Sequence, residues 1–381
     1  IWLNQDYFAY ATGLRMVNEE KWEGLFGFPR RLPEAELDQR HGDLALAIQQ
    51  VTEEIVLRMA RTAKKLTGAR TLCLSGGVAL NCVANGKLLR EGIFDDIWIQ
   101  SAAGDAGGAL GAAYAVHHMY CGQERKPADG ADRMQGAYLG PEFSDLDIMT
   151  LARRYKAPYQ YYGDTDRLSK AVAGQLAQGK AVGWFQGRME WGPRALGNRS
   201  ILGDARNKEM QKRLNLKIKF RESFRPFAPS VLYEDLATYF AADRPSPYML
   251  LIADVRESRW NPLPDDYHRQ SLRDKLYYVR SDIPAVTHLD YSARLQTVHR
   301  ETNPRFWSLI SAFKAETGCG VIVNTSFNVR GEPIVCTPED AYRCFMRTDM
   351  DILVLGNFVF NKAEEPPWKE ERDWRQDLIL D

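Results

Sequence analysis

The chain has 381 residues, which exceeds the usual size of one hydrophobic core, so we expect two domains. Its 50 basic residues balance its 50 acidic residues, and this neutrality argues against broad attraction to nucleic acid or to an anionic membrane. No apolar run approaches the roughly 20 residues that a membrane helix needs, and no basic and apolar leader opens the chain. We therefore expect a globular, cytoplasmic protein. Because the sequence begins with Ile1 in place of Met, we also expect an upstream part.

The first third of the chain alternates helices and strands. Apolar residues recur at helical spacing over residues 43–66, which predicts one long amphipathic helix. Short buried strands are expected over residues 71–74 and 97–99, and each leads through small residues into a helix, the second of which ends near Tyr120. This order predicts an α/β layer. The polar stretch over residues 121–135 that follows is where we place the link between two domains.

The rest of the chain predicts a second, α+β domain. We expect helices over residues 144–155, 166–178, 207–216 and 305–317, and another that Thr337 caps. We expect strands over residues 181–185, 227–232, 248–255 and 320–324, and a closing hairpin of residues 352–355 and 358–360. Residues 256–283 are charged and irregular, which indicates a surface excursion.

Two small-residue turns in the α/β layer suit a ligand. Gly76 and Gly77 stand between a strand and the helix that Asn81 opens, where backbone N–H groups can bind phosphate. The same pattern also serves packing alone, and both interpretations stay open. Asp105 stands where the second strand gives way to a helix, and either caps that helix or ligates a divalent metal.

Two basic stretches lie in the second domain. Residues 187–200 carry three arginines among glycines and a proline, which suits a loop around an anion, although solvated arginines are the alternative: Arg188, Arg194 and Arg199. Further on, Lys219, Arg221 and Arg225 alternate with phenylalanines. If this stretch is a strand, Lys219 and Arg221 share one face with Ser223.

A set of polar side chains about a hundred residues later could form a site together with this second stretch. They follow a buried strand and are Asn324, Ser326, Asn328 and Arg330. Because the chain is neutral overall, cations gathered near hydroxyl and backbone donors predict a site for a phosphate or carboxylate. An exposed strand face is the alternative.

The sequence resembles the NodU/CmcH-type O-carbamoyltransferases through four blocks, at residues 75–81, 104–111, 189–197 and 324–334. Residues 284–288 and 296–298 also fit, and the resemblance spans about residues 40–360. It implies the later half of an actin-like domain, of the kind in threonylcarbamoyl-adenosine tRNA-modifying enzymes, over residues 1–128. A linker and connecting helix over residues 129–157 and a YrdC-like α+β domain over residues 158–381 would follow.

The resemblance also implies an activity. In the YrdC-like domain, ATP and carbamoyl phosphate would give carbamoyl adenylate and pyrophosphate. The carbamoyl group would then pass to a hydroxyl of a small molecule, such as an antibiotic or a sugar, in the actin-like domain. The implied catalytic tetrad is Lys219, Arg221, Ser326 and Asn328. The residues that we expect to bind the nucleotide and its phosphates are Gly76, Gly77, Asn81, Arg188, Arg194, Arg199, Arg225, Asn324 and Arg330.

The resemblance gives Asp105 the place of a metal ligand, for iron or for Mg²⁺ or Mn²⁺, with the remaining ligands expected in an upstream segment. The expected partners are an N-terminal fragment of the same protein and a second copy in a homodimer, with no nucleic acid and no membrane. Two alternatives stay open. One is a threonylcarbamoyl-transfer enzyme acting on tRNA, which the neutral charge disfavours. The other is a non-catalytic, nucleotide-binding relic.

Overall fold

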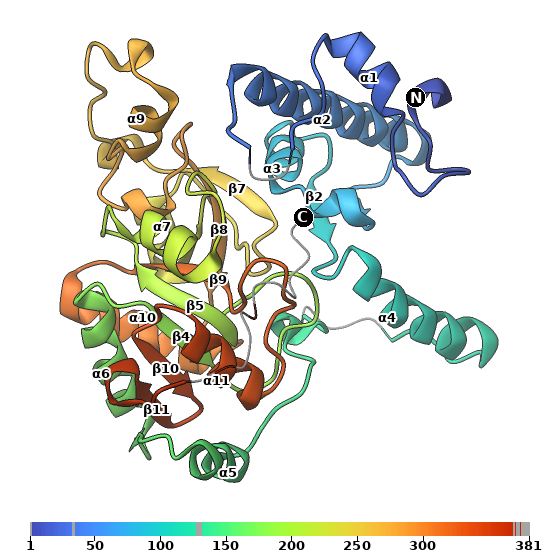
Figure 1. The fold of residues 1–381 in the computed structure, drawn as a ribbon. Helices are drawn as coiled ribbons and strands as arrows, with labels where there is room; N and C mark the ends of the chain where they lie inside the picture. Colours follow the sequence, from blue (N-terminus) through green and yellow to red (C-terminus); the bar gives the residue numbers. More distant parts are fainter. Residues whose placement is uncertain (1, 33–34, 127–131, 369, 371–373, 375–381) are drawn as a thin grey trace. The chain divides into compact units, whose positions relative to one another are not determined.

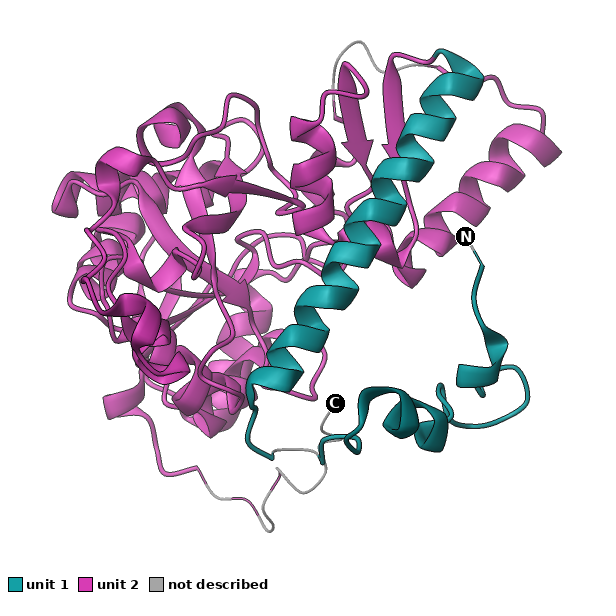
Figure 2. Cartoon of the chain, turned by 90° about the horizontal axis from the view of Figure 1, so that it is seen from above, with its two compact units in different colours: residues 1–68, 379–381 teal, residues 69–378 magenta. Residues whose placement is uncertain are grey.

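A computed structural model describes residues 2–32, 35–126 and 132–368, together with residues 370 and 374. The chain divides into two compact units, residues 1–68 with 379–381 and residues 69–378 (Figure 2). This division does not test the expected domain boundaries, the first of which falls at residues 128–129, outside the described residues. No helix in the described ranges is both long enough and apolar enough to cross a membrane.

The first unit contains the helices α1 (Glu19–Phe26) and α2 (Gln39–Thr67). Helix α2 begins where the Asp38 side chain accepts from the backbone N–H of His41, and the His41 side chain completes a capping box. It ends at Gly68, whose φ of 65° places it in the left-handed region that favours glycine. The long helix predicted over residues 43–66 is thereby confirmed.

The second unit opens with the predicted α/β layer. Strands β1 (Thr71–Leu74) and β2 (Asp96–Ile99) pair in parallel, and helices α3 (Cys82–Arg90) and α4 (Asp105–Ala115) follow them. Helix α3 packs closely on strand β7 (Leu251–Asp254), because a Cβ on Gly86 would lie 2.6 Å from Cγ1 of Ile252. The Asn85 side chain also donates to the Leu250 carbonyl at 3.0 Å. The layer is therefore seated against the large sheet.

The large sheet has nine strands in the order β3-β11-β10-β4-β5-β9-β6-β8-β7 (Figure 1). Besides β7, its strands are β3 (Gln160–Tyr161), β4 (Val182–Phe185), β5 (Arg199–Asp204), β6 (Ala228–Leu232), β8 (Ser292–Val298), β9 (Val321–Ser326), β10 (Ile352–Leu355) and β11 (Phe358–Asn361). Strand β9 lies inside the sheet and pairs antiparallel with both β5 and β6. Its last residue, Ser326, pairs with Ser200 of β5 and lies two residues beyond the pairing with β6.

The second unit has further helices. They are α5 (Asp145–Tyr155), α6 (Thr165–Ala177), α7 (Met210–Arg213), α8 (Leu236–Tyr239), α9 (Leu272–Tyr277), α10 (Pro304–Thr317) and α11 (Pro338–Arg347). Helices α6 and α10 pack on each other and on the middle strands, whereas α11 packs with α5 and on β4 and β10. The second unit is thus a mixed α/β structure around one large apolar core.

Several elements of this unit were not expected, namely strands β3, β5 and β8 and the short helix α9. The helix expected over residues 207–216 is confirmed from Met210, as the short α7 that continues into a π-helical turn, Leu214–Lys219. The strand expected for Lys219 and Arg221 does not form, because Phe220 between them takes a left-handed conformation, with φ of 50°.

Candidate active site

Lys219, Ser326 and Asn328 form one hydrogen-bonded cluster, although 107 residues separate the lysine from the serine. The Lys219 ammonium donates to the Ser326 carbonyl, to Ser326 Oγ at 3.1 Å and to Asn328 Oδ1 at 2.7 Å. Ser326 Oγ also donates to Asn328 Oδ1 at 2.7 Å. Lys219 is 2% exposed. Burial, and then the positive charge of Arg221, lower the pKa of its ammonium well below the ordinary value.

Arg221 is oriented by a neutral side chain. The π-helical turn and the left-handed Phe220 bring the Arg221 backbone N–H to the Asn215 carbonyl at 3.0 Å. The Arg221 Nε donates to Asn215 Oδ1 at 2.8 Å, and its guanidinium lies 5.1 Å from the centre of the Phe227 ring. Burial lowers the pKa of Arg221 to about 10, with the Arg225 charge as a further cause. An amide fixes the guanidinium without neutralising it, which leaves its charge for a ligand.

Further cations surround Arg221. Arg225 pairs with Glu222 at 2.9 Å, and Arg330 lies 3.9 Å from the same carboxylate. Arg294, on strand β8, is a residue that the sequence reasoning missed. Burial, and then the positive charges of Arg194 and Arg221, lower its pKa to about 10. The signal in the sequence that could have found it is a single charged residue within the otherwise uncharged residues 292–298.

The site therefore holds buried positive charge in excess. Across the described parts of the chain, no carboxylate lies within ion-pair distance of Arg221 or Arg294. A buried charge without a partner is costly, whereas a charge-assisted bond to an anion is among the strong ones in proteins. This arrangement suits a polyanionic ligand that takes the place of the missing carboxylates.

The three arginines of residues 187–200 do not converge on one anion. Arg199 is fully buried, stacks 3.5 Å above the Phe185 ring and donates to four main-chain carbonyls, those of Gln186, Gly187, Asn198 and Pro141. Arg188 donates to the Gly140 carbonyl at 3.1 Å. Arg194 points instead toward the α/β layer, where its Nη2 donates to the Leu80 carbonyl at 3.1 Å. Anion binding by Arg188 and Arg199 stays a prediction that this geometry does not favour.

The glycine turn expected to bind nucleotide lies next to Arg194. Gly76 has a φ of 95°, which an L side chain rarely adopts, and its N–H donates to the Ala103 carbonyl at 2.8 Å. Gly77 begins the 3-10 turn that ends at Leu80, the residue bound by Arg194. Asn81 caps α3, since its side chain accepts from the backbone N–H of Ala84 at 3.1 Å. The role of these three residues toward a nucleotide stays a prediction.

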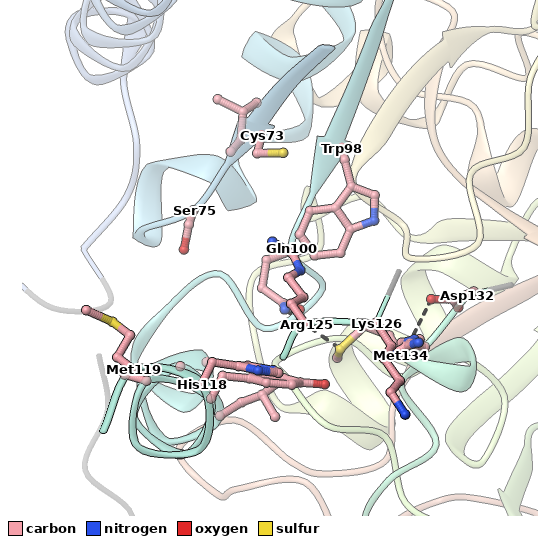
Figure 3. A pocket seen from close by; sticks show the side chains of 17 residues that line it. Cys73, Ser75, Trp98, Gln100, His118, Met119, Arg125, Lys126, Asp132 and Met134 are labelled. Carbon is pink, nitrogen blue, oxygen red and sulfur yellow. Dashed lines mark hydrogen bonds between the residues drawn. The ribbon is translucent and has the colours of Figure 1, made fainter. Parts of the chain in front are cut away.

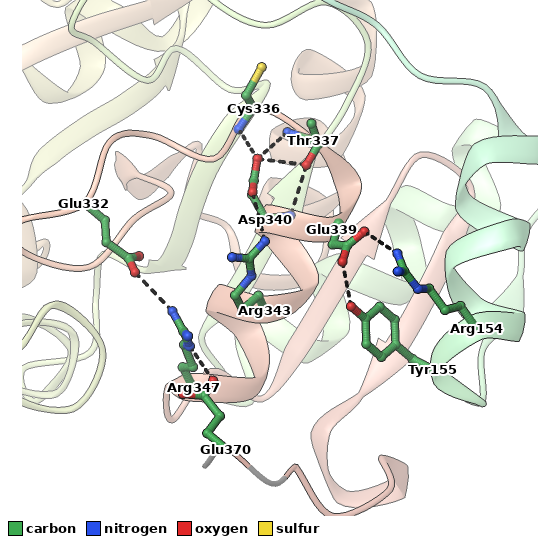
Figure 4. Close-up of polar contacts among 10 residues, drawn as sticks. All are labelled: Arg154, Tyr155, Glu332, Cys336, Thr337, Glu339, Asp340, Arg343, Arg347 and Glu370. Carbon is green, nitrogen blue, oxygen red and sulfur yellow. Dashed lines mark hydrogen bonds and ion pairs between the residues drawn. The ribbon is translucent and has the colours of Figure 1, made fainter. Parts of the chain in front are cut away.

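Asn324 forms hydrogen bonds inside the protein, next to the site. It is fully buried, and its Nδ2 donates to the Ala195 carbonyl, to Ser230 Oγ and to Gln296 Oε1. Asn328 connects the cluster to helix α11, because its Nδ2 donates to the Glu332 carbonyl at 2.7 Å. The Glu332 carboxylate in turn bonds Arg347, which also bonds Glu370 (Figure 4). Asn328 is thus tied through Glu332 to Arg347 of α11.

A cavity of about 800 Å³ adjoins β1, β2 and α4 (Figure 3). Its polar lining includes Ser75, Gln100 and His118, together with the cations Arg125 and Lys126. Asp105 opens α4 and is exposed. No group of three or more His, Cys, Asp or Glu side chains that could hold a metal occurs among the described residues, so those present do not make up a metal site around Asp105. The metal stays a prediction.

Comparison with known proteins gives two family models. The model described as the carbamoyltransferase N-terminus matches residues 2–114, and that of the carbamoyltransferase C-terminus matches residues 173–362. Among solved structures, full-length HypF in its phosphate- and nucleotide-bound form is similar at 18% identity over 54% of this chain and 23% of that chain. Its TM-score of 0.34 is too low to assign a fold.

Three curated relatives illustrate the similarity. An uncharacterized protein of Synechocystis sp. is 58% identical over 100% of this chain and 62% of its own length. Nodulation protein NolO of Bradyrhizobium diazoefficiens is 42% identical over 85% of this chain and 55% of its own. The 3'-hydroxymethylcephem-O-carbamoyltransferase of Amycolatopsis lactamdurans is 34% identical over 84% of this chain and 54% of its own. The chain spans less than two thirds of each of these relatives. It belongs to the carbamoyltransferase family, of the NodU/CmcH type.

Proposed function

We propose that the chain is part of an ATP-dependent O-carbamoyltransferase, and that its C-terminal region activates the carbamoyl donor. The observation that carries the proposal is a group of cationic side chains held by neutral partners in and next to the tetrad. Lys219 bonds Ser326 and Asn328, Asn215 fixes Arg221, and Arg294 stands on the neighbouring strand β8. ATP and carbamoyl phosphate are both polyanions, so bringing them together needs fixed positive charge in a site that excludes water. The named cephem O-carbamoyltransferase relative supports the same class of reaction.

The first half-reaction is an adenylation. One oxygen joins the carbamoyl carbon to the α-phosphorus in carbamoyl adenylate. The balance therefore consumes carbamoyl phosphate, ATP and one water, and releases inorganic phosphate and pyrophosphate. Arg221 and Lys219 stabilise the negative charge on the phosphoryl groups, and Ser326 and Asn328 hold the lysine in place through their bonds to its ammonium.

The second half-reaction transfers the carbamoyl group to a hydroxyl. The acceptor oxygen attacks the carbamoyl carbon, the bond to the α-phosphate oxygen breaks, AMP leaves and the hydroxyl proton is lost. We place the small-molecule acceptor in the cavity of Figure 3, because Ser75 on its wall opens the glycine turn. A divalent metal held in part by Asp105 belongs to the proposal, but the residues described here do not complete its site and no step is derived through it.

The finer expectations belong to the same proposal. They are an actin-like half-domain before a YrdC-like domain, a cytoplasmic location, and a homodimer or an N-terminal fragment of the same protein as partner. Support for the two domain types comes from the sequence blocks in the two regions.

The test is carbamoyl-phosphate-dependent release of pyrophosphate from ATP. We expect release by the wild type and its loss in Arg221→Ala and Asn328→Ala, with the fold retained by circular dichroism. Activity of either variant within a few-fold of wild type would show that the site is misplaced. Tight nucleotide binding without turnover, even with the remainder of the longer protein supplied, would favour the non-catalytic relic. Binding of tRNA with a steep salt dependence would favour the threonylcarbamoyl-transfer enzyme.

A further inference from the structure

The loop between β4 and β5 is organised around a buried carboxylate. Glu190 is 5% exposed, and its Oε1 accepts from three backbone N–H groups of its own loop. These belong to Leu196 at 2.7 Å, Asn198 at 2.8 Å and Arg199 at 3.2 Å. Successive backbone N–H groups that converge in this way form an anion-binding concavity. Here a side chain of the loop itself occupies the concavity, which closes residues 190–199 into a fixed turn.

Side chains outside the loop bind two of its carbonyl groups. Asn324 Nδ2 donates to the Ala195 carbonyl at 3.2 Å. Gln296 Nε2 and the Tyr138 hydroxyl both donate to the Leu196 carbonyl at 2.8 Å. Asn324 and Gln296 stand on the central strand β9 and on β8, so the loop is attached to the same strands that carry Ser326 and Arg294.

The side chain of Arg194 extends from this loop toward the glycine turn. Its Nη2 donates to the Leu80 carbonyl. Arg294 stands two residues before Gln296 on the same face of β8, and Gln296 bonds the Leu196 carbonyl of the loop, so Arg294 lies beside the loop that carries Arg194. The positive charge of Arg194 accordingly lowers the pKa of Arg294. The Nε of Arg194 is buried and has no protein partner in the described structure. The loop therefore places Arg194 between the glycine turn and Arg294, with a donor left for a ligand.

We propose that Glu190 is a positioning residue of the donor-activating site, which fixes Arg194 between Leu80 and Arg294 by binding the three N–H groups of its loop. The inference rests on the proposed function. Glu190 touches no reacting group in this arrangement and acts through Arg194. Without its carboxylate, three buried N–H groups lose their acceptor, and the turn that holds Arg194 must change to find others.

The experiment is a double-mutant cycle between Glu190 and Arg194. The variants are Glu190→Ala, Arg194→Ala and their combination, measured by pyrophosphate release and by calorimetric affinity for pyrophosphate. Glu190→Gln keeps an acceptor oxygen in the same place. Glu142→Gln is the matched control, since Glu142 is an exposed carboxylate whose charge acts on Arg199 but which accepts no bond from residues 196–199. Glu190→Asp, which shortens the reach by one methylene, replaces Glu190→Ala if that variant does not fold.

We expect Glu190→Ala to lower kcat/KM by about 100-fold, because a small displacement of a positioned group has effects of that size. We expect Glu190→Gln and Glu142→Gln to stay within a few-fold of wild type. In the Arg194→Ala background, Glu190→Ala should have little further effect. A full additional loss in that background, or wild-type behaviour of Glu190→Ala, would overturn the inference. Pyrophosphate binding with no turnover by the wild type would overturn the proposed function alone, whereas no binding at all would overturn both.

Discussion

Replacing Lys219 with methionine tests whether the lysine contributes to catalysis without contributing much to the stability of the fold. Methionine keeps most of the volume of the lysine stem and removes the ammonium. Two of the three acceptors of that ammonium have a second donor. The Ser326 carbonyl accepts from the Asn328 N–H at 3.1 Å, and Asn328 Oδ1 accepts from Ser326 Oγ at 2.7 Å. The third acceptor, Ser326 Oγ, keeps this bond to Asn328 as a donor. The substitution therefore leaves none of the three atoms without a hydrogen bond, and we expect the free energy of unfolding at pH 7 to change by less than about 1.5 kcal/mol.

The pH dependence of stability gives a second readout of Lys219→Met. Because burial lowers the pKa of Lys219, the unfolded chain binds more protons than the folded protein between that lowered pKa and the ordinary lysine value of about 10.4. The free energy of unfolding of the wild type should therefore rise with pH in this window, and the contribution of Lys219 should be missing in Lys219→Met. Pyrophosphate release should fall by about 100- to 1000-fold, as when one donor to a developing charge is lost.

Urea unfolding at pH 7 and pH 9.5, followed by circular dichroism, measures both stability effects. Ser308→Ala, at a partly exposed position on α10, is a control for handling a substitution in the same unit. A loss of more than about 3 kcal/mol at pH 7 would mean that Lys219 is a structural cation, because breaking a buried pair costs that much. An unchanged pH dependence relative to wild type would mean that Lys219 is not buried as described.

Three further substitutions test separate parts of the account. Arg294→Ala should weaken pyrophosphate binding by about 10- to 100-fold, which is the contribution of one charge-assisted hydrogen bond. The thermal midpoint of the unliganded protein should not fall. An unchanged affinity in calorimetry would refute the role of Arg294 in binding the anion. Asp105→Asn should lower carbamoyl transfer to the acceptor but spare pyrophosphate release; equal loss in both assays would contradict the division between the two half-reactions. Gly86→Ala should cost about 1–3 kcal/mol in urea unfolding, because its Cβ would lie 2.6 Å from Ile252 Cγ1, and an unchanged midpoint would mean that α3 does not pack on β7.

Most of the regular elements could be predicted because their signals are local. The helical spacing over residues 43–66 gave α2, and Thr337 followed by Pro338 gave the start of α11. Strand β8 was missed because its arginine and polar residues interrupt the apolar pattern, and these side chains bond residues distant in the sequence, such as Leu196 and Ser246. Residues 292–298 therefore form a strand because of tertiary contacts, which a local sequence pattern does not show.

The candidate site was predicted in composition but not in backbone form. The alternation of Lys219, Phe220 and Arg221 imitates the period of a strand, whereas a π-helical turn and a left-handed Phe220 bring Lys219 to Ser326 and Asn328. Anion binding by the three arginines stays a prediction, and the geometry gives Arg199 another role, since it lies inside the loop and satisfies main-chain carbonyls. A count of arginines cannot distinguish a cation that binds a ligand from one that holds a turn.

The most direct test of the central claim is a crystal structure of the protein with pyrophosphate bound. We expect pyrophosphate oxygens within hydrogen-bond distance of Lys219 and Arg221, with Arg294 close enough to contact the same anion. Pyrophosphate bound elsewhere, with these three side chains unchanged and directed away from it, would contradict the claim that they form one donor-activating site.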